Sequence, residues 1–327
     1  MSIVSYTLAN NQGDVVHIAN YGARLLKWIT DVEDHSRNII LGYEKLEDYL
    51  QDSYFIGAIV GPYANRIAHS TCTVDGKILQ LNANEGEHHL HGGNNALANL
   101  FWECIEQTKN TLTLRCELAD GFNGYPGGML VEVTYQLFEE SELTIAIQVI
   151  TEQATIAGPT AHPYFNLDQE QSINQHCLHI FSHQITPTYL SGLPQGNISN
   201  VASTEFDYLT PKRITEKTIL DNNYLLTSED SSLQSQTLQH AILQSADKKL
   251  KLHVDSNYPA MQVYTGQYLE APFNRSQGLC LEPQFCPDSP NQSNYPFHLT
   301  TQHQPLNTHI TYRLEKTTIN RASAIKN

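Results

Sequence analysis

Apolar and polar residues alternate with a period of two along several stretches of this chain, and this pattern constrains the fold more than any other feature. In 130–138 every second residue from Val131 onward is apolar or aromatic, and 142–150 repeats the pattern from Leu143. Successive side chains of a strand point to opposite faces, so alternation indicates strands with one buried face. Glu139-Glu140-Ser141 lies between the two stretches and is typical of a turn, so together they predict a hairpin.

Further strands are predicted along the rest of the chain, at 3–8, 15–19, 111–117, 178–184, 250–254, 262–265, 278–283 and 310–314. Helical periodicity is scarce, and only 43–51 indicates a short helix. A doubly wound α/β fold needs a helix between successive strands, so this class is excluded. We expect an all-β protein, a large antiparallel β-sandwich with few short helices. It would form a single domain over 1–316, followed by a frayed tail at 317–327.

The charge of the chain excludes several classes of partner. There are 19 Lys and Arg against 34 Asp and Glu, which gives a formal net charge of −15. Nucleic acids and anionic lipid surfaces attract proteins through a basic face, so we expect neither as a partner. No apolar run approaches the roughly 20 residues of a membrane-spanning helix. The first residues lack the basic start and apolar core of a signal peptide, so we expect a cytoplasmic protein.

Histidines and cysteines were weighed as metal ligands. His88, His89 and His91 suggest a metal site, but on a strand His89 and His91 would share one face and His88 the other. No cysteine or carboxylate cluster completes the set at a spacing typical of zinc, so we expect no metal. The six cysteines are scattered without a C-x-x-C pair, and free buried thiols are the interpretation we favour.

Four segments combine ionisable residues with Gly, Pro and aromatic residues at the predicted strand ends. They are GPYANRIA (61–68), HHLHGGN (88–94), TAHPYFNL (160–167) and LEPQFCPDSPN (281–291). Arg66 can bind a ligand oxygen or close a surface ion pair, and Gly92-Gly93 allows close backbone approach to a ligand or a plain turn.

His162 stands beside two aromatic residues, Tyr164 and Phe165, whose faces suit the apolar side of a sugar ring. It can act as an acid or base, or be a hydrogen-bonded core histidine. Glu282 follows an apolar run, so burial would raise its pKa toward that of a useful base. It could also pair with Arg66 for purely structural reasons, and the charge of Arg66 would then oppose the effect of burial.

Taken together, these segments resemble the aldose 1-epimerase (galactose mutarotase) family. The resemblance runs from about Tyr21 to Leu314 and rests on an ordered set of motifs: YANRIA, LHGG, T-x-HPYFNL, LDNNYLL, MQVYTG and LEPQFCPDSPN. It implies a β-sandwich with an open sugar cleft. It also implies interconversion of the α and β anomers of free aldoses such as galactose and glucose, without cofactor or metal.

The resemblance also implies a role for individual residues. Glu282 of the LEPQ segment would be the general base, and His162 of HPYFNL the general acid. His91 and Arg66 would contact the sugar near the reacting end, and Asn65, Asp221 and Gln262 would hold hydroxyl groups. The partner would be a small aldose, and the chain a monomer or homodimer. One position departs from the family's usual G-R-x-x-N-R-I: Pro62 replaces the first Arg, which puts the support of that loop in doubt.

Three alternative functions remain open at this point. A hexose-6-phosphate mutarotase would need a basic cluster near the motifs, and none is evident. A non-catalytic sugar-binding protein should lack the acid or the base, but both are present. A glycosidase would use a carboxylate pair such as Glu282 with Asp221, but the sequence shows no recognisable hydrolase setting for such a pair.

Overall fold

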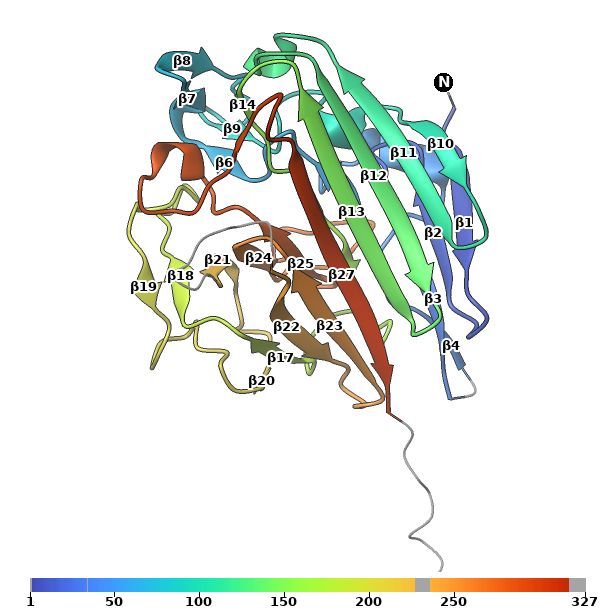
Figure 1. The fold of residues 1–327 in the computed structure, drawn as a ribbon. Coiled ribbons are helices and arrows are strands. Elements are labelled where there is room, and N and C mark those ends of the chain that lie inside the picture. The colour runs from blue at the N-terminus through green and yellow to red at the C-terminus, as the bar shows by residue number, and fades with distance from the viewer. Residues whose placement is uncertain (1, 34, 227–235, 318–327) are drawn as a thin grey trace, which may run out of the picture.

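Long antiparallel strands dominate the computed structural model, which describes residues 2–33, 35–226 and 236–317 (Figure 1). The largest sheet has nine strands, and Figure 1 shows β12, β13 and β27 as long neighbouring arrows. Its order is β10 (Glu103–Gln107), β11 (Thr111–Leu118), β12 (Met129–Phe138), β13 (Glu142–Thr151), β27 (Leu306–Lys316), β23 (Leu250–Ser256), β22 (Leu238–Gln244), β17 (Cys177–Ile180) and β20 (Lys212–Arg213). The predicted hairpin is β12–β13, which pairs Met129 with Thr151 at its open end.

Two further sheets complete the framework. The six-stranded sheet has the order β16 (Tyr164–Phe165), β25 (Leu279–Gln284), β24 (Ala260–Tyr264), β21 (Asp221–Leu225), β18 (Gln184–Thr186) and β19 (Ser199–Asn200). The four-stranded sheet has the order β1 (Ser5–Ala9), β2 (Val15–Ala19), β3 (Leu25–Val32) and β4 (His35–Asn38). The all-β prediction is thus confirmed, with three main sheets instead of two.

Short elements connect these sheets. Two-stranded ladders join β5 (Ile59–Val60) to β15 (Thr160–Ala161), β6 (Arg66–Ile67) to β9 (His89–Leu90), β7 (Thr71–Val74) to β8 (Lys77–Gln80), and β14 (Thr155–Ile156) to β26 (Leu299–Thr300). The described helices are all short 3₁₀ turns: η1 (Leu46–Gln51), η2 (Ala68–Ser70), η3 (Leu97–Asn99), η4 (Phe122–Gly124) and η5 (Ser289–Asn291). None of the helices in the described ranges is long and apolar enough to cross a membrane.

The main core lies between the nine-stranded and six-stranded sheets. The Tyr312 ring of β27 packs against Phe165 of β16 with centroids 4.9 Å apart, and its hydroxyl donates to the Leu281 carbonyl of β25 at 2.9 Å. Alternate residues of β12 and β13 are buried, as the period of two predicts. Each fully buried Val, Leu or Ile contributes about 1.5–3 kcal/mol, so this layer fixes the six-stranded sheet in place.

One predicted strand is wrong. The stretch 178–184 was expected to form a single strand, but the chain leaves the nine-stranded sheet after β17 and enters the six-stranded sheet at β18. Ser182 marks the crossing, where its hydroxyl lies 2.5 Å from the Leu225 carbonyl and 2.8 Å from the Gln184 carbonyl. The helix predicted for 43–51 shortens to η1. The tail predicted for 317–327 lies outside the described residues from residue 318 onward.

Candidate active site

The six-stranded sheet presents a polar face that carries three of the predicted site residues. Gln262 of β24 pairs with Glu282 of β25, and Asp221 of β21 pairs with Tyr264 of β24. Cross-strand partners in an antiparallel sheet share a face, and so do residues two apart on one strand. Asp221, Gln262 and Glu282 therefore point the same way, while Val263 and the other alternate residues face the core. The alternation that builds the fold thus also sorts the polar groups into one row.

All seven predicted site residues line a single cavity of about 300 Å³ above this face. The walls come from the loop before β6, from β9 and from the turn between β15 and β16. The lining residues are Ser53, Tyr54, Phe55, Asn65, Arg66, Leu90, His91, His162, Tyr164, Asp221, Gln262, Tyr264, Tyr268 and Glu282. Segments more than 200 residues apart in the sequence therefore meet here.

Glu282 is 1% exposed and lies at the floor of the cavity. Its Oε1 is 3.5 Å from Nε2 of His162, and its Oε2 has no hydrogen-bond partner among the described residues. Burial, with a smaller contribution from the charge of Asp221, raises the pKa of the Glu282 carboxyl well above its ordinary value. A carboxylate with one unused oxygen facing a cavity can accept a proton from a bound hydroxyl group.

His162 is held by backbone hydrogen bonds in the turn between β15 and β16. Its N–H donates to the Ala58 carbonyl at 2.9 Å, and its carbonyl accepts from the Gly57 N–H at 3.0 Å. Nδ1 lies 3.6 Å from the Cys280 sulfur, which leaves Nε2 facing Glu282. Burial lowers the pKa of His162 to about 4. Burial therefore favours the neutral form of both side chains.

Arg66 does not pair with Glu282. Its Nε lies 2.6 Å and its Nη2 2.7 Å from the two carboxylate oxygens of Glu85, in a bidentate geometry. Burial lowers the pKa of Arg66, but the hydrogen bonds and charge of Glu85 outweigh that effect and raise it. The sequence left open whether Arg66 would keep Glu282 ionised. With its guanidinium bound to Glu85, burial prevails at Glu282.

Asn65 and His91 support each other at the cavity wall. The Asn65 N–H donates to Nδ1 of His91 at 3.1 Å, so the neutral ring carries its proton on Nε2. Burial, together with the nearby charges of His162 and Arg66, lowers the pKa of His91 well below its ordinary value. His91 is thus a neutral hydrogen-bond donor. The Asn65 side-chain oxygen accepts from the Arg66 N–H at 2.9 Å, which leaves its amide NH₂ available to the cavity.

The three neighbouring histidines separate, because the strand β9 ends at Leu90 and His91 has a φ of 49°. His89 is buried on a different set of partners, the Tyr125 hydroxyl and the Asn82 carbonyl. Gly92 explains the glycines of the LHGG motif: a Cβ at this position would lie 1.9 Å from the Gly61 carbonyl oxygen. The close approach suggested by the sequence is therefore to the protein's own backbone.

Asp221 and Gln262 lie beside Glu282 on the sheet face that forms the floor of the cavity. The Gln262 amide donates to Asp221 Oδ1 at 2.8 Å, and Gln262 Oε1 has no hydrogen-bond partner within the described ranges. Burial raises the pKa of Asp221, partly opposed by Arg66 and by this hydrogen bond. An unpaired buried acceptor is costly unless a ligand donates to it, so this oxygen points to a ligand with hydroxyl groups.

The loop that contains Pro62 is supported by the end of the LEPQFCPDSPN segment. The Pro62 carbonyl accepts from the Gly158 N–H at 2.8 Å, and the Tyr63 hydroxyl donates to the Cys286 carbonyl at 3.0 Å. Oδ1 of Asp288 accepts a hydrogen bond from the Ala68 N–H at 3.0 Å, and the Asp288 N–H donates to the Arg66 carbonyl at 2.8 Å. These bonds hold the loop without the arginine that the family usually has at position 62.

Glu85 and most of the aromatic lining are not predicted from the sequence. Tyr54 and Phe55 belong to a stretch that shows only an apolar run, and Phe55 packs on His91 with centroids 4.8 Å apart. Tyr264 and Tyr268 stack at 6.2 Å and an interplanar angle of 22°. Of the two aromatic residues that the sequence singled out after His162, Tyr164 lines the cavity and Phe165 lies in the core. Nothing in the local sequence pairs Glu85 with Arg66.

Comparisons with known proteins place this arrangement in a family. The sequence profile described as aldose 1-epimerase matches residues 4–313. The aldose 1-epimerase of Escherichia coli (strain K12) is 33% identical over 309 residues, which cover 89% of this chain and 88% of that protein. The galactose mutarotase of Homo sapiens is 32% identical, covering 82% of this chain and 81% of that protein.

Solved structures share the fold. A GalM/aldose epimerase homologue from C. elegans superposes with a TM-score of 0.90 at 24% identity, covering 97% of this chain and all of that one. A galactose 1-epimerase from Lactobacillus acidophilus NCFM gives a TM-score of 0.81 at 25% identity, covering 97% and 99% of the two chains. The polar row on the six-stranded sheet, the matching profile and the similarity over most of both chains agree, and the chain belongs to the aldose 1-epimerase family.

Proposed function

We propose that this chain is an isomerase that interconverts the α and β anomers of free aldohexoses such as galactose and glucose. The observation that carries the proposal is the pair Glu282 and His162, 3.5 Å apart at the floor of a cavity rich in hydroxyl-binding groups. Relatives named aldose 1-epimerase and galactose mutarotase support the same reaction. Anomer exchange changes no oxidation state, and one acid with one base can perform it.

The reaction requires the movement of two protons. Glu282 takes the proton from the hydroxyl on C1, and His162 gives a proton to the ring oxygen O5 while the C1–O5 bond breaks. The resulting aldehyde rotates about C1–C2, the C5 hydroxyl attacks its other face, and both protons return. Atoms and charges balance, because the enzyme ends in the state in which it began. Each positioned group typically contributes about 10²–10⁴-fold to the rate.

The acid and the base together need only one transferable proton. Protonated Glu282 with neutral His162 contains as many protons as ionised Glu282 with protonated His162. Burial favours the neutral form in the ligand-free cavity. A bound sugar supplies hydroxyl groups that stabilise the charged form, so the reactive state forms when substrate is present.

The surrounding groups would orient the ring. His91 and Arg66 are donors that can stabilise charge on the reacting oxygens, and Asn65, Asp221 and Gln262 can bind the hydroxyl groups. The aromatic rings of the wall offer apolar contact for a sugar face. Hydrogen bonds from donors and acceptors that are already fixed cost little reorganisation at the moment of reaction.

The charge of the cavity favours a free sugar over a sugar phosphate. Among the described residues that line it, Arg66 is the only Lys or Arg, and Glu85 already occupies its guanidinium. Asp221 and Glu282 would repel a phosphate dianion unless protonated. A 6-phosphate would need a cluster of free donors, which this lining does not offer.

Polarimetry on freshly dissolved α-D-galactose and α-D-glucose tests the proposal. Wild type should accelerate the change in optical rotation, and Glu282→Gln and His162→Ala should each lose about 10²-fold or more. Glu117→Gln, an exposed substitution on β11, is the matched control and should keep full activity. Near-normal turnover by either site variant would refute the assignment of that residue.

The same assay separates the alternative functions. A rate that appears only with galactose 6-phosphate or glucose 6-phosphate would favour the phosphorylated substrate. Binding of sugar without any change in rotation rate would indicate a binding protein. Release of reducing sugar from an aryl glycoside would revive the hydrolase alternative, in which Glu282 and Asp221 act together.

A further inference from the structure

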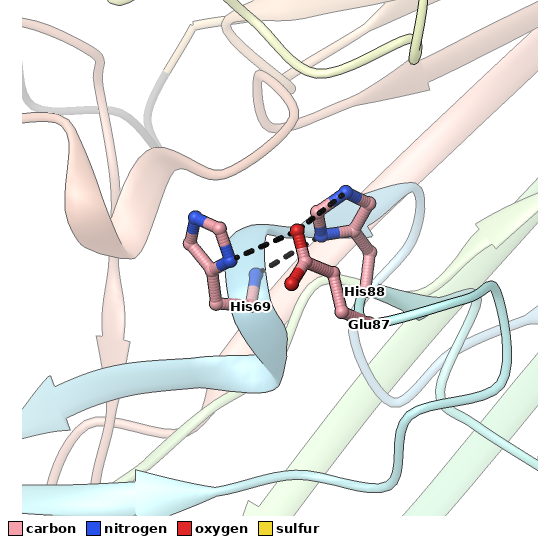
Figure 2. A group of neighbouring side chains, drawn as sticks. All are labelled: His69, Glu87 and His88. Carbon is pink, nitrogen blue, oxygen red and sulfur yellow. Dashed lines mark hydrogen bonds and ion pairs between the residues drawn. The ribbon is translucent and has the colours of Figure 1, made fainter.

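A second group of ionisable side chains lies outside the cavity, between η2 and β9 (Figure 2). His69 Nδ1 is 3.3 Å from Glu87 Oε1, and His88 Nε2 is 3.9 Å from the same oxygen. One nitrogen or oxygen from each residue lies within 4.8 Å of the other two. Figure 2 shows both rings directed at the Glu87 carboxylate. Two imidazoles and one carboxylate thus converge on one point.

The group connects the two strands of the β6–β9 ladder. Arg66 pairs with Leu90 and Ile67 with His89. His69 therefore follows β6 in the chain, and Glu87-His88 comes directly before β9. The segment 84–91 also contains His91, which lines the cavity, and Glu85, which binds Arg66 of the cavity wall. Any ligand that bridges His69 to Glu87 and His88 would therefore fix this wall from outside.

We propose that His69, Glu87 and His88 form a binding site for a late first-row divalent cation such as Zn²⁺. Imidazole nitrogens and a carboxylate oxygen are the ligands such ions take, at 2.0–2.2 Å. Ligands at that distance in a tetrahedron lie about 3.4 Å from one another. The separation of His69 Nδ1 and Glu87 Oε1, 3.3 Å, is close to this value, and the 3.9 Å between His88 Nε2 and Glu87 Oε1 exceeds it by about half an ångström.

Two of the three ligands are largely exposed to solvent. The side chains of His69 and Glu87 are 68% and 69% exposed, while that of His88 is 14% exposed. Water can complete the coordination of the ion, and the ligands can adjust without disturbing the core. Binding also has a cost, because the His69 N–H donates to His88 Nδ1 at 3.1 Å. An ion on Nε2 moves the ring proton to Nδ1 and breaks that hydrogen bond.

The sequence suggests His88 as a metal ligand, but with the wrong partners. It grouped His88 with His89 and His91, which face other groups in the structure. Glu87 and His69 complete the set instead, and a spacing of 18 residues between His69 and Glu87 hides their proximity. The missing carboxylate is that of Glu87, which is adjacent to His88 in the chain.

Any test must separate this site from the cavity. Among the described residues, one other group offers three ligands within the same distance, namely His162, Cys280 and Glu282. Because that group contains a thiol, Co²⁺ bound there would show strong near-ultraviolet charge-transfer absorption from the sulfur. Co²⁺ bound to His69, Glu87 and His88 would not.

Isothermal titration of the full, metal-free chain with ZnCl₂ is the decisive measurement. Wild type should bind one ion outside the cavity, and His69→Ala, His88→Ala and Glu87→Gln should each weaken this binding tenfold or more. His303→Ala removes another exposed histidine and should change nothing. Cys280→Ser removes a ligand from the cavity group and should leave this site intact. These readouts are independent of activity, so failure of the proposed function would not affect them.

Two results would overturn the proposal. One is the absence of Zn²⁺ binding by wild type. The other is binding that His69→Ala and His88→Ala leave unchanged while Cys280→Ser abolishes it. Because His69 and Glu87 are exposed, these variants should fold, and a circular dichroism spectrum equal to that of wild type checks this. A rise in the thermal midpoint with Zn²⁺, lost in His69→Ala, would support the linkage between the ion and the fold.

Discussion

At the scale of single residues, the acid and base roles proposed for His162 and Glu282 need opposite charges, yet burial drives both side chains toward neutrality. The active pair holds one proton. Below about pH 4 His162 takes up a second, and above the raised pKa of Glu282 the pair loses the last one. We therefore expect kcat/KM to stay level between these two transitions and to fall on either side of them. Polarimetric rates across the pH range of the folded protein will show this. An acid midpoint near 6.5, the ordinary pKa of histidine, would contradict it.

A second residue-scale prediction concerns Glu85, which positions Arg66 without facing the reacting atoms itself. Glu85→Gln keeps the shape of the side chain but removes the charge that holds the guanidinium. The freed Arg66 can then pair with Asp221 and compete with substrate hydroxyl groups. Because a charge-assisted hydrogen bond contributes about 1.5–3 kcal/mol, we expect kcat/KM to fall about tenfold or more, mainly through KM.

The matched control for Glu85 is Glu87→Gln. It removes a carboxylate from the same segment, but one that faces His69 and His88 instead of Arg66. Metal-free Glu87→Gln should therefore keep the wild-type KM. Equal losses in both variants would mean that the segment responds to charge in general, and Glu85 would have no specific positioning role.

At the scale of elements, the sequence predicts what local periodicity controls. The β12–β13 hairpin is identified because both strands are long and each has one solvated face. The switch of sheets after β17 is missed, because it depends on the pairing of β18 with β21 in the other sheet, which local periodicity does not report. Likewise, motif order predicts Glu282 and His162 as candidate site residues, but the Glu85–Arg66 pair depends on how β6 meets β9.

Gly92 gives an element-scale prediction about this ladder. Gly92→Ala would place a Cβ 1.9 Å from the Gly61 carbonyl oxygen, with a φ of +92°. The backbone after β9 must then move, and we expect a loss of about 2–4 kcal/mol in the free energy of unfolding, measured by urea titration. Gly76→Ala has φ +74° and open space around the added methyl, so it should lose only about 1 kcal/mol. Equal losses in the two variants would mean that the close approach is unimportant.

At the scale of the whole molecule, the packing of the sheets keeps the Glu282 carboxyl buried with one oxygen unpaired among the described residues, which lowers the free energy of unfolding. The nine-stranded sheet fixes β25, and β25 fixes Glu282 with one oxygen unsatisfied. Since burial raises its folded-state pKa, the folded protein binds this proton more tightly than the unfolded chain. The contribution of Glu282 to stability is thus full below its unfolded pKa and is lost as pH rises through the folded pKa.

Glu282→Gln tests whether burial of the Glu282 carboxyl destabilises the folded protein. The amide has nearly the same shape but does not titrate, so the variant should be more stable than wild type at neutral pH. The difference should grow by about 1.4 kcal/mol per pH unit above pH 4.5 until the folded carboxyl ionises. Urea unfolding at several pH values measures it, with Glu117→Gln as the exposed control. A pH-independent difference would mean that burial at this position does not act on the charge of Glu282. An inactive variant whose stability advantage over wild type grows with pH would show that the carboxyl serves function at the expense of the fold.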